Sequence, residues 1–288
     1  MTDRPLLIDR PALDRRRARA QRHGLDLFLH QQVVDEVQER LIEVNRSFTA
    51  PAIVAGFKSP WQDLGGALAD ATLVEDADLL ALEPQAHDLV IHSLCLHAAN
   101  DPVGQIIQCR RALKPDGLFI AVLLGGNTLH ELRAALAEAE TRLTGGLSPR
   151  VVPMGDIRDL GALLQRAGLA LPVADSHVQT LLYSDLSRLY ADLRAMGETN
   201  ALTQRHRRFA SRALFEQTAR IYAQSFGRDT GQLPATVETV YLTGWAPDAT
   251  QQQPLRPGSA ATRLADALNT DEAPLPDKAG RDGTHNKT

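Results

Sequence analysis

Two short apolar runs with one helical segment between them constrain the fold most. The runs cover residues 88–96 and 118–124. Each suits a buried strand, and the longest uninterrupted apolar run, 118–124, is far below the ~20 residues that span a bilayer. Residues 103–113 have apolar side chains at helical spacing, and the Lys-Pro-Asp-Gly sequence at 114–117 is typical of a turn. This order predicts strands of a parallel sheet joined by a crossover helix.

The same alternation continues along the middle of the chain. It predicts an open, mainly parallel α/β sheet with helices on both faces, of the Rossmann-like kind. Ligands of such sheets bind beyond the carboxyl ends of the strands. Helices are expected at 30–48, 61–70, 103–113, around 128–136, 156–168, 185–196 and 204–225, and strands at 52–56, 71–75, 88–96, 118–124, 178–182 and 239–245.

The two ends differ from the middle. Residues 1–29 form an arginine-rich arm, with seven arginines before residue 23. The arm is interpreted as a solvated helix, or as a segment that touches an acidic partner or lipid headgroups. The α/β domain is expected over 30–246, with a helical cap at about 184–228 inserted between the last two strands. Residues 247–288 have the composition of a mostly disordered tail.

Charge and cysteine content exclude some classes of protein. The net charge is −4, which does not favour a general nucleic-acid binder. The two cysteines, Cys95 and Cys109, form no C-x-x-C pair, so a reducing cytoplasmic compartment is expected. The arginine-rich arm would also permit peripheral contact with the inner membrane. No His, Cys, Asp or Glu spacing is typical of a metal site.

Several motifs carry a family resemblance. Residues 88–97 and 113–117 resemble the fourth and fifth strands of class I S-adenosylmethionine-dependent methyltransferases. Residues 125–133, Gly-Gly-Asn-Thr-Leu-His-Glu-Leu-Arg, are similar to a signature of the methyltransferase-like assembly factors of respiratory complex I, which are relatives of the malonyl-carrier-protein methyltransferase of biotin synthesis. Matching motifs follow in the order of that subfamily at 145–149, 159–161, 196–200, 234–236, 244–245 and 256–260.

The resemblance implies a methyltransferase sheet whose last strand is antiparallel, and S-adenosylmethionine as the cofactor. It also implies a protein or carrier-bound substrate, or a respiratory-complex subunit, as partner. The family motifs fall on loops, where binding residues gather. The residues expected at this substrate or partner rim are Gly125, Gly126, Asn127, Thr128, Glu131, Arg133, Ser148, Pro149, Glu198 and Asn200.

The cofactor-binding half departs from the family pattern. Where the family has an acid followed by G-x-G-x-G, this chain has Gly56, then Phe57 and Pro60. Only 32 positions separate Gly56 from Asp88, too few for two α/β units. We therefore expect a shortened first half and weak binding of S-adenosylmethionine, if any. The residues expected nearest the cofactor are Gly56, Glu75, Ser93 and Leu94, and the acid for the ribose hydroxyls could be Glu75, Asp76 or Glu83.

Candidate catalytic residues are few. His92 and His97 flank the end of the strand at 88–96, where an imidazole could accept a proton or contact a substrate. The alternative for each is a core or rim histidine satisfied by the backbone. Methyl transfer depends mostly on alignment of the reactants, so a sparse catalytic set does not exclude it.

Three functions remain open at this stage. The first is a methyltransferase-like enzyme acting on a protein or carrier-bound substrate in connection with respiratory-complex assembly. The second is a non-catalytic pseudo-methyltransferase that serves as an assembly or binding factor. The third is an enzyme that modifies a protein arginine.

Overall fold

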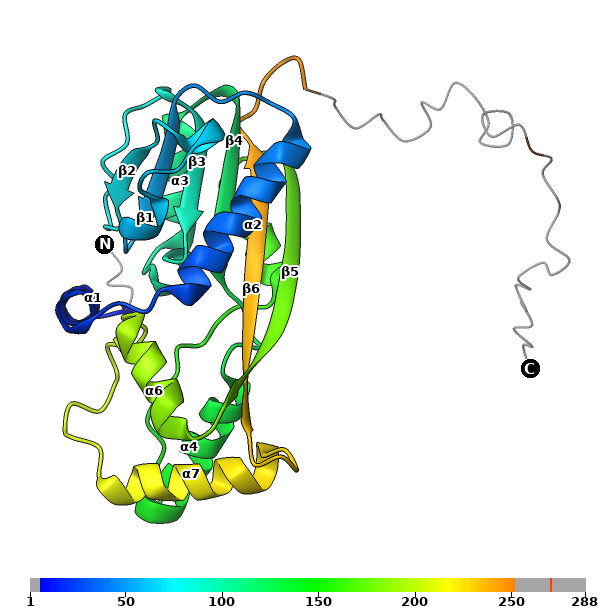
Figure 1. Cartoon of the computed structure of the whole chain (residues 1–288). Helices are drawn as coiled ribbons and strands as arrows, with labels where there is room; N and C mark the ends of the chain where they lie inside the picture. Colours follow the sequence, from blue (N-terminus) through cyan, green and yellow to red (C-terminus); the bar gives the residue numbers. More distant parts are fainter. Residues whose placement is uncertain (1–5, 252–269, 271–288) are drawn as a thin grey trace, which may run out of the picture. The chain divides into compact units, whose positions relative to one another are not determined.

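The apolar runs of the sequence become the central strands of a six-stranded sheet. The computed structural model describes residues 6–251 and residue 270. The strand order is β2-β1-β3-β4-β6-β5, and β6 is antiparallel to both of its neighbours while the others run parallel (Figure 1). The strands are β1 (Pro51–Ala55), β2 (Thr72–Glu75), β3 (His87–Ser93), β4 (Leu113–Leu124), β5 (Ala170–Tyr183) and β6 (Leu233–Trp245).

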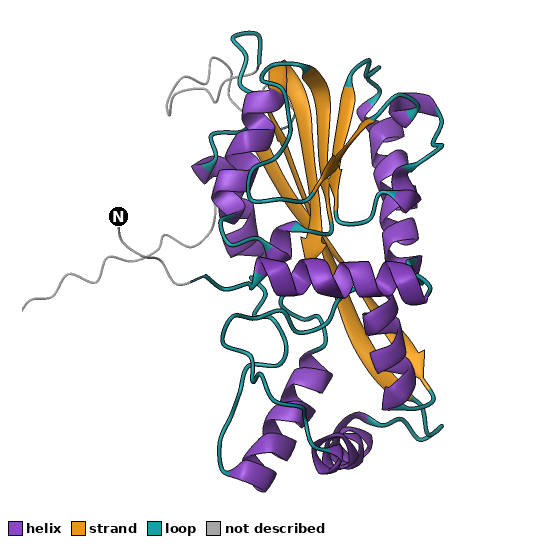
Figure 2. Cartoon of the chain, turned by 90° about the vertical axis from the view of Figure 1, so that its left-hand side faces the viewer, coloured by secondary structure: helices purple, strands orange, loops and turns teal. Residues whose placement is uncertain are grey.

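Helices cover both faces of this sheet (Figure 2). α3 and α5 pack on one face and α2 packs on the other. Three further helices, α4, α6 and α7, form a separate apolar cluster with the end of β6. The helices are α1 (Arg10–His23), α2 (Phe28–Val44), α3 (Pro102–Ala112), α4 (His130–Thr144), α5 (Ile157–Arg166), α6 (Leu186–Ala195) and α7 (Arg212–Phe226).

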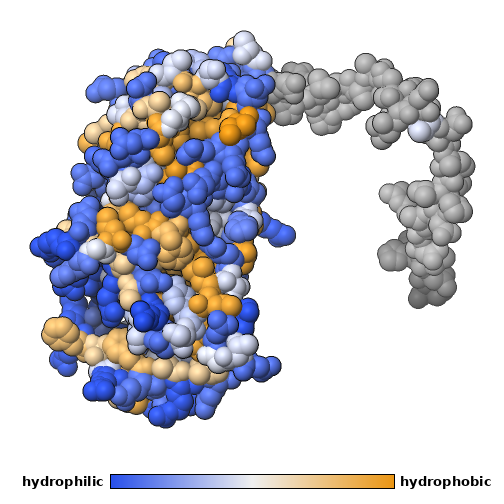
Figure 3. Space-filling model, in the orientation of Figure 1, coloured by the Kyte–Doolittle hydropathy of each residue, from blue (hydrophilic) through white to orange (hydrophobic). Residues whose placement is uncertain are grey.

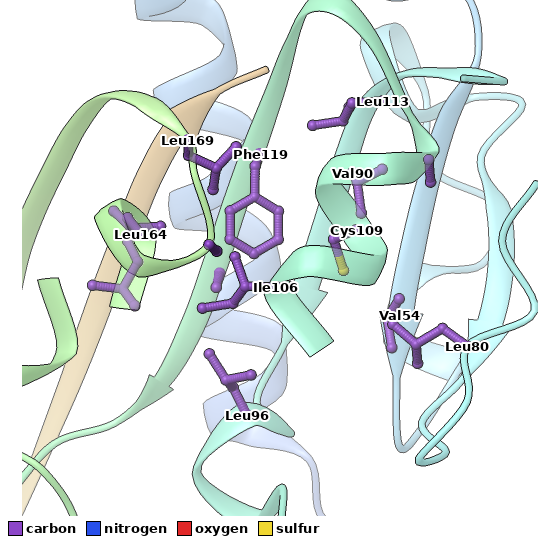
Figure 4. Packing of buried hydrophobic residues seen from close by; sticks show 14 of the residues in the cluster. Val54, Leu80, Val90, Leu96, Ile106, Cys109, Leu113, Phe119, Leu164 and Leu169 are labelled. Atoms are coloured by element: carbon purple, nitrogen blue, oxygen red, sulfur yellow. The ribbon is translucent and has the colours of Figure 1, made fainter. Parts of the chain in front are cut away.

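The core explains why β3 and β4 read as continuous apolar runs. Successive side chains of a strand point to opposite faces. Val90 and Phe119 therefore pack under α3 with Ile106 and Cys109 (Figure 4), while Ile91 lies on the α2 side. All of these residues are fully buried. A strand that is covered on both faces cannot alternate with polar residues.

β5 and β6 continue past the carboxyl ends of the parallel strands as a two-stranded ribbon (Figures 1 and 2). Leu233 and Ala235 of β6 pack in the cluster of cap helices. The hydroxyl of Tyr222 in α7 donates a 2.6 Å hydrogen bond to the carbonyl of Pro234. The expected helical cap between the last two strands is therefore present, and β6 connects it to the centre of the sheet.

The shortened first half is confirmed. Between β1 and β3 the chain forms only β2 and two 3₁₀ turns, Ser59–Trp61 and Gly66–Leu68. The helix expected over 61–70 is wrong, because Gly65 and Gly66 interrupt it and Gly66 has φ +64°. β2 is the edge of the sheet, which has one strand fewer on that side than the family resemblance implies.

Two other expectations need adjustment. The turn at 114–117 lies inside β4 as an irregularity, since the register shifts from His87↔Leu113 to Leu89↔Leu118. β5 is much longer than the expected strand at 178–182. The predicted disordered tail, apart from residues 247–251 and 270, and the motif at 256–260 lie outside the described residues.

The Gly-Gly turn after β4 is built around Glu238 of β6. The Asn127 N–H donates a 2.8 Å hydrogen bond to the Glu238 carboxylate, and Thr128 exchanges hydrogen bonds with the Glu238 backbone. Glu238 is buried and lies directly over Gly125, so a Cβ at position 125 would come within 2.6 Å of the carboxylate carbon. Gly125 is therefore required for this close approach.

We predict that Gly125→Ala destabilises the protein by about 1–3 kcal/mol, because Glu238 must leave its hydrogen bond to make room. Gly126→Ala is the matched control, since its Cβ would meet nothing closer than 3.4 Å. Urea unfolding monitored by circular dichroism measures both changes. Equal stability of the two variants would contradict the assigned role of Gly125.

Candidate functional site

The strand order reverses beside β1, and the carboxyl ends of β1 and β3 meet at that point. This is where open α/β sheets form a ligand crevice. Gly56 follows β1 and Cys95 follows β3, and the Gly56 N–H donates to the Cys95 sulfur at 3.0 Å. Burial raises the pKa of the Cys95 thiol to about 12, so the sulfur stays protonated and is not a nucleophile at neutral pH.

The guanidinium of Arg17, from α1, fills this crevice. Its Nη1 lies 2.6 Å from the Asp76 carboxylate and its Nη2 lies 3.6 Å from the Cys95 sulfur. A Cβ placed on Gly56 would be only 2.6 Å from the Arg17 Cζ. The single glycine of the cofactor turn is thus in contact with an arginine of the same chain.

Asp76 holds two arginines. Arg10 lies 3.0 Å from the same carboxylate oxygen and also donates to the Asp76 carbonyl. Although burial raises the pKa of Asp76, the nearby charges of Arg17 and Arg10 hold it below its ordinary value. The carboxylate therefore stays ionised and anchors α1 to the end of β2.

The interpretation of the arm as a solvated helix is therefore wrong for residues 6–23. Asp9 caps α1 by accepting from the Ala12 N–H. Leu13 and Ala20 are buried, and Arg17 is 7% exposed. Arg10 and Arg17 are seven residues apart, so they lie on one face of the helix and both reach Asp76.

The residues predicted to bind the cofactor have different surroundings and do not share one cavity. Glu75 is exposed at the end of β2, whereas Asp76 beside it is buried. Ser93 is buried at the end of β3, and its hydroxyl has no hydrogen-bond partner among the described residues. Leu94 has φ +46° and lines a small cavity of about 190 Å³ that faces α2. Glu83 is exposed in the loop before β3.

These residues do not fit S-adenosylmethionine while α1 is docked. One Asp76 oxygen binds both arginines, and the other is buried without a partner among the described residues. Phe57 is 2% exposed and its ring packs edge-on against His30. A Cβ on Gly197 would lie 3.0 Å from the same ring. Burial lowers the pKa of His30 to about 4, so this imidazole is neutral and belongs to the packing.

The two candidate catalytic histidines have different surroundings. His92 is fully buried inside β3 and its Nε2 lies 2.7 Å from the Gln105 amide oxygen. Burial lowers its pKa, and it reaches no cavity described below. His97 lines a large cavity, and its Nε2 lies 3.5 Å from the Glu198 carboxylate. Of the two, only His97 is placed to meet a ligand.

That cavity, here called the cap pocket, has a volume of about 750 Å³. It lies beyond the carboxyl end of β4, between α1, α4, α6 and the ribbon of β5 and β6. Of the ten predicted rim residues, Thr128, Glu198 and Asn200 line it. The Asn200 amide donates to the Pro149 carbonyl at 2.9 Å, which holds one wall of the pocket.

The remaining rim residues hold the surrounding loops together. Glu131 is buried and accepts hydrogen bonds from the backbone and hydroxyl of Thr236. Ser148 donates to the Glu140 carboxylate, which also binds Arg150. Arg133 donates to the Thr128 carbonyl. Gly125, Gly126 and Ser148 are not among the lining residues and lie beside Glu238, the 154–155 loop and Glu140, so their expected role at a substrate or partner rim stays a prediction.

Sequence reasoning missed most of the pocket's charged groups. Arg150, Arg194 and Arg205 line the cavity and lie in no motif that suggests ligand binding, whereas Arg16, which also lines it, belongs to the arginine-rich arm. Within the described residues no group of three or more His, Cys, Asp or Glu side chains could hold a metal ion. No helix in this part of the chain is long and apolar enough to cross a bilayer.

Comparison with known proteins supports the methyltransferase resemblance. Residues 58–121 match the family model described as "Methyltransferase domain". The chain is 40% identical over 190 residues to the arginine-hydroxylase NDUFAF5 of Dictyostelium discoideum, covering 66% of this chain and 43% of that protein. Against the human protein of that name the identity is 35% over 195 residues, covering 68% and 56%.

A second group of relatives comprises malonyl-[acyl-carrier protein] O-methyltransferases. The Methylovorus protein is 37% identical over 174 residues, covering 60% of this chain and 56% of its own length. The chain thus spans about half the length of the curated relatives it matches. Among solved structures, the [4+2]-cyclase SpnF aligns with a TM-score of 0.44 at 14% identity, covering 84% of this chain and 98% of that chain.

We predict that Asp76→Asn lowers the free energy of unfolding by about 3–5 kcal/mol at pH 7, because it leaves Arg17 buried without a counter-charge. The folded-state pKa of Asp76 is depressed, so this contribution is present above the ordinary aspartate pKa of 3.8 and is lost as the pH falls through the folded value. The difference in the free energy of unfolding between wild type and variant should therefore become smaller in acid.

Asp78→Asn is the matched control for this prediction. Asp78 lies 3.9 Å from Arg10, but its side chain is 69% exposed, so the change should stay within about 0.5 kcal/mol. Thermal unfolding between pH 3 and pH 7 distinguishes the two. Similar small losses in both variants would show that Arg17 does not depend on Asp76.

Proposed function

Because this chain belongs to the class I S-adenosylmethionine-dependent methyltransferase superfamily, we propose that it has kept the fold for recognition and acts as a non-catalytic assembly or binding factor for a partner protein. One observation carries the proposal: the Arg17 guanidinium lies against Gly56 and on Asp76, in the crevice where the fold binds its cofactor.

The partner is proposed from the relatives. The downstream motifs resemble those of respiratory complex I assembly factors, and the relatives with 34–40% identity are named as mitochondrial arginine-hydroxylases. The partner would then be a respiratory-complex subunit bound at the cap. The cytoplasmic location expected from the sequence, beside the inner membrane, stays a prediction.

A second candidate function is modification of an arginine on that partner. The identity to arginine-hydroxylases favours it. Under this candidate, one arginine of the partner would be heavier by one oxygen atom, whereas a non-catalytic factor would leave the partner unmodified. Mass spectrometry of the partner, purified from strains with and without this gene, distinguishes the two.

We predict that the full chain binds neither S-adenosylmethionine nor S-adenosylhomocysteine with a dissociation constant below about 1 mM, since the cradle is filled by Arg17. Isothermal titration calorimetry measures this directly. A dissociation constant at or below about 10 μM would overturn the proposal.

Deletion of the gene in its source organism should reduce the amount of assembled respiratory complex. Normal assembly in the deletion strain would contradict the assembly role.

A further inference from the structure

The cap pocket carries a large excess of positive charge. Six arginines line it: Arg16, Arg150, Arg194, Arg205, Arg207 and Arg208. The only carboxylate among the lining residues is Glu198, and it faces His97. Such a site favours an anion.

Part of this charge forms no salt bridge within the described residues. Asp9 pairs with Arg205 and Arg207, and Glu140 pairs with Arg150. No salt bridge is formed by Arg16 or by Arg194. Burial lowers the pKa of Arg16, and the neighbouring charge of Arg205 lowers it further. An anion beside Arg16 would relieve both effects.

Three side-chain atoms of pocket-lining residues lack partners. The Nε of Arg16, the Nδ1 of His97 and the hydroxyl of Tyr190 are buried and make no hydrogen bond to a described residue. Tyr190 and Arg194 are four residues apart on α6, so they lie on the same face of that helix. Unsatisfied buried polar atoms are rare in native structures, and these three belong to residues around a cavity large enough for a ligand.

Much of the remaining lining is apolar. Leucines come from the end of β4, from α4 and from α6, including Leu124, Leu132, Leu136, Leu189 and Leu193. Figure 3 shows apolar side chains gathered around the start of α2 and over the lower part of β5 and β6, above the cap helices. A volume of about 750 Å³ is within the usual range for small-molecule sites.

We propose that the cap pocket binds a single-chain anionic amphiphile, with its head among the lining arginines, Arg16 included, and its alkyl chain along the leucine wall. A carboxylate or phosphate head can accept paired hydrogen bonds from a guanidinium. The alkyl chain of the ligand would displace water from the leucine side chains. This inference does not depend on the proposed assembly function.

Isothermal titration of the full chain with decanoate, dodecanoate and tetradecanoate, below their micellar concentrations, tests the proposal. Saturation at one equivalent is expected, with affinity rising about fourfold for each added methylene. Dodecanol, which lacks the charge, should bind at least tenfold more weakly than dodecanoate. Dodecyl phosphate is the second head group, and tighter binding than dodecanoate would identify a phosphate-headed lipid as the natural class.

Two variants locate the head group. Arg16→Gln should weaken dodecanoate binding at least tenfold, whereas Arg15→Gln, on the exposed side of α1 and outside the pocket lining, should not change it.

No saturable binding up to about 1 mM, equal affinity for dodecanol, or equal losses in the Arg15 and Arg16 variants would each overturn the proposal. A normal assembly phenotype together with specific dodecanoate binding would reject the assembly role alone. Failure of the amphiphile proposal can therefore be distinguished from failure of the assembly role.

Discussion

A buried carboxylate with two arginines on one oxygen links the amino-terminal helix to the sheet. Asp76 ends the β2 segment, Arg10 and Arg17 come from α1, and both guanidinium groups are nearly buried. When α1 is docked, the attraction between these charges offsets the hydration that they lose. The position of α1 also determines which of its side chains reach the crevice and the cap. Arg17 covers Gly56, its backbone lies against Gly197 at the edge of the cap, and Arg16 lines the cap pocket.

The shortened first half and the docked helix are complementary. Only β2 and two 3₁₀ turns fill the stretch between β1 and β3, so the sheet ends one strand early. Without a longer loop at Gly56, the crevice at the carboxyl ends of β1 and β3 is covered by a helix from elsewhere in the chain. The same residues that would accept a cofactor instead accept an internal guanidinium.

Sequence patterns predicted the parts of the fold whose cause is local. β3 and β4 are buried on both faces, so their apolar runs identified them. The helix expected at 156–168 is α5, and Gly168, with φ +77°, follows its end. β5 was underestimated because much of it is exposed and carries no apolar pattern. The site was less predictable. Arg17 meets Asp76 from 59 positions away, and nothing near either residue specifies that partner. Thr128, Glu198 and Asn200 were expected at the rim because they fall in family motifs, and they line the pocket. Glu131 and Ser148 fall in similar motifs, but their hydrogen bonds are to Thr236 and Glu140.

β6 has a consequence for how the molecule opens. Its first residues, Leu233 and Ala235, belong to the cap, and residues 239–245 pair with β4 in the middle of the sheet. A covering element on a flexible loop can detach with little effect on what it covers. Here the cap is built on the same strand that completes the core, so separating it from the sheet would break the β6 ladder. The cap and the sheet should therefore exchange their amide hydrogens as one cooperative unit. We expect a ligand to enter the pocket by movement of side chains and of the 196–210 loop, which lines it.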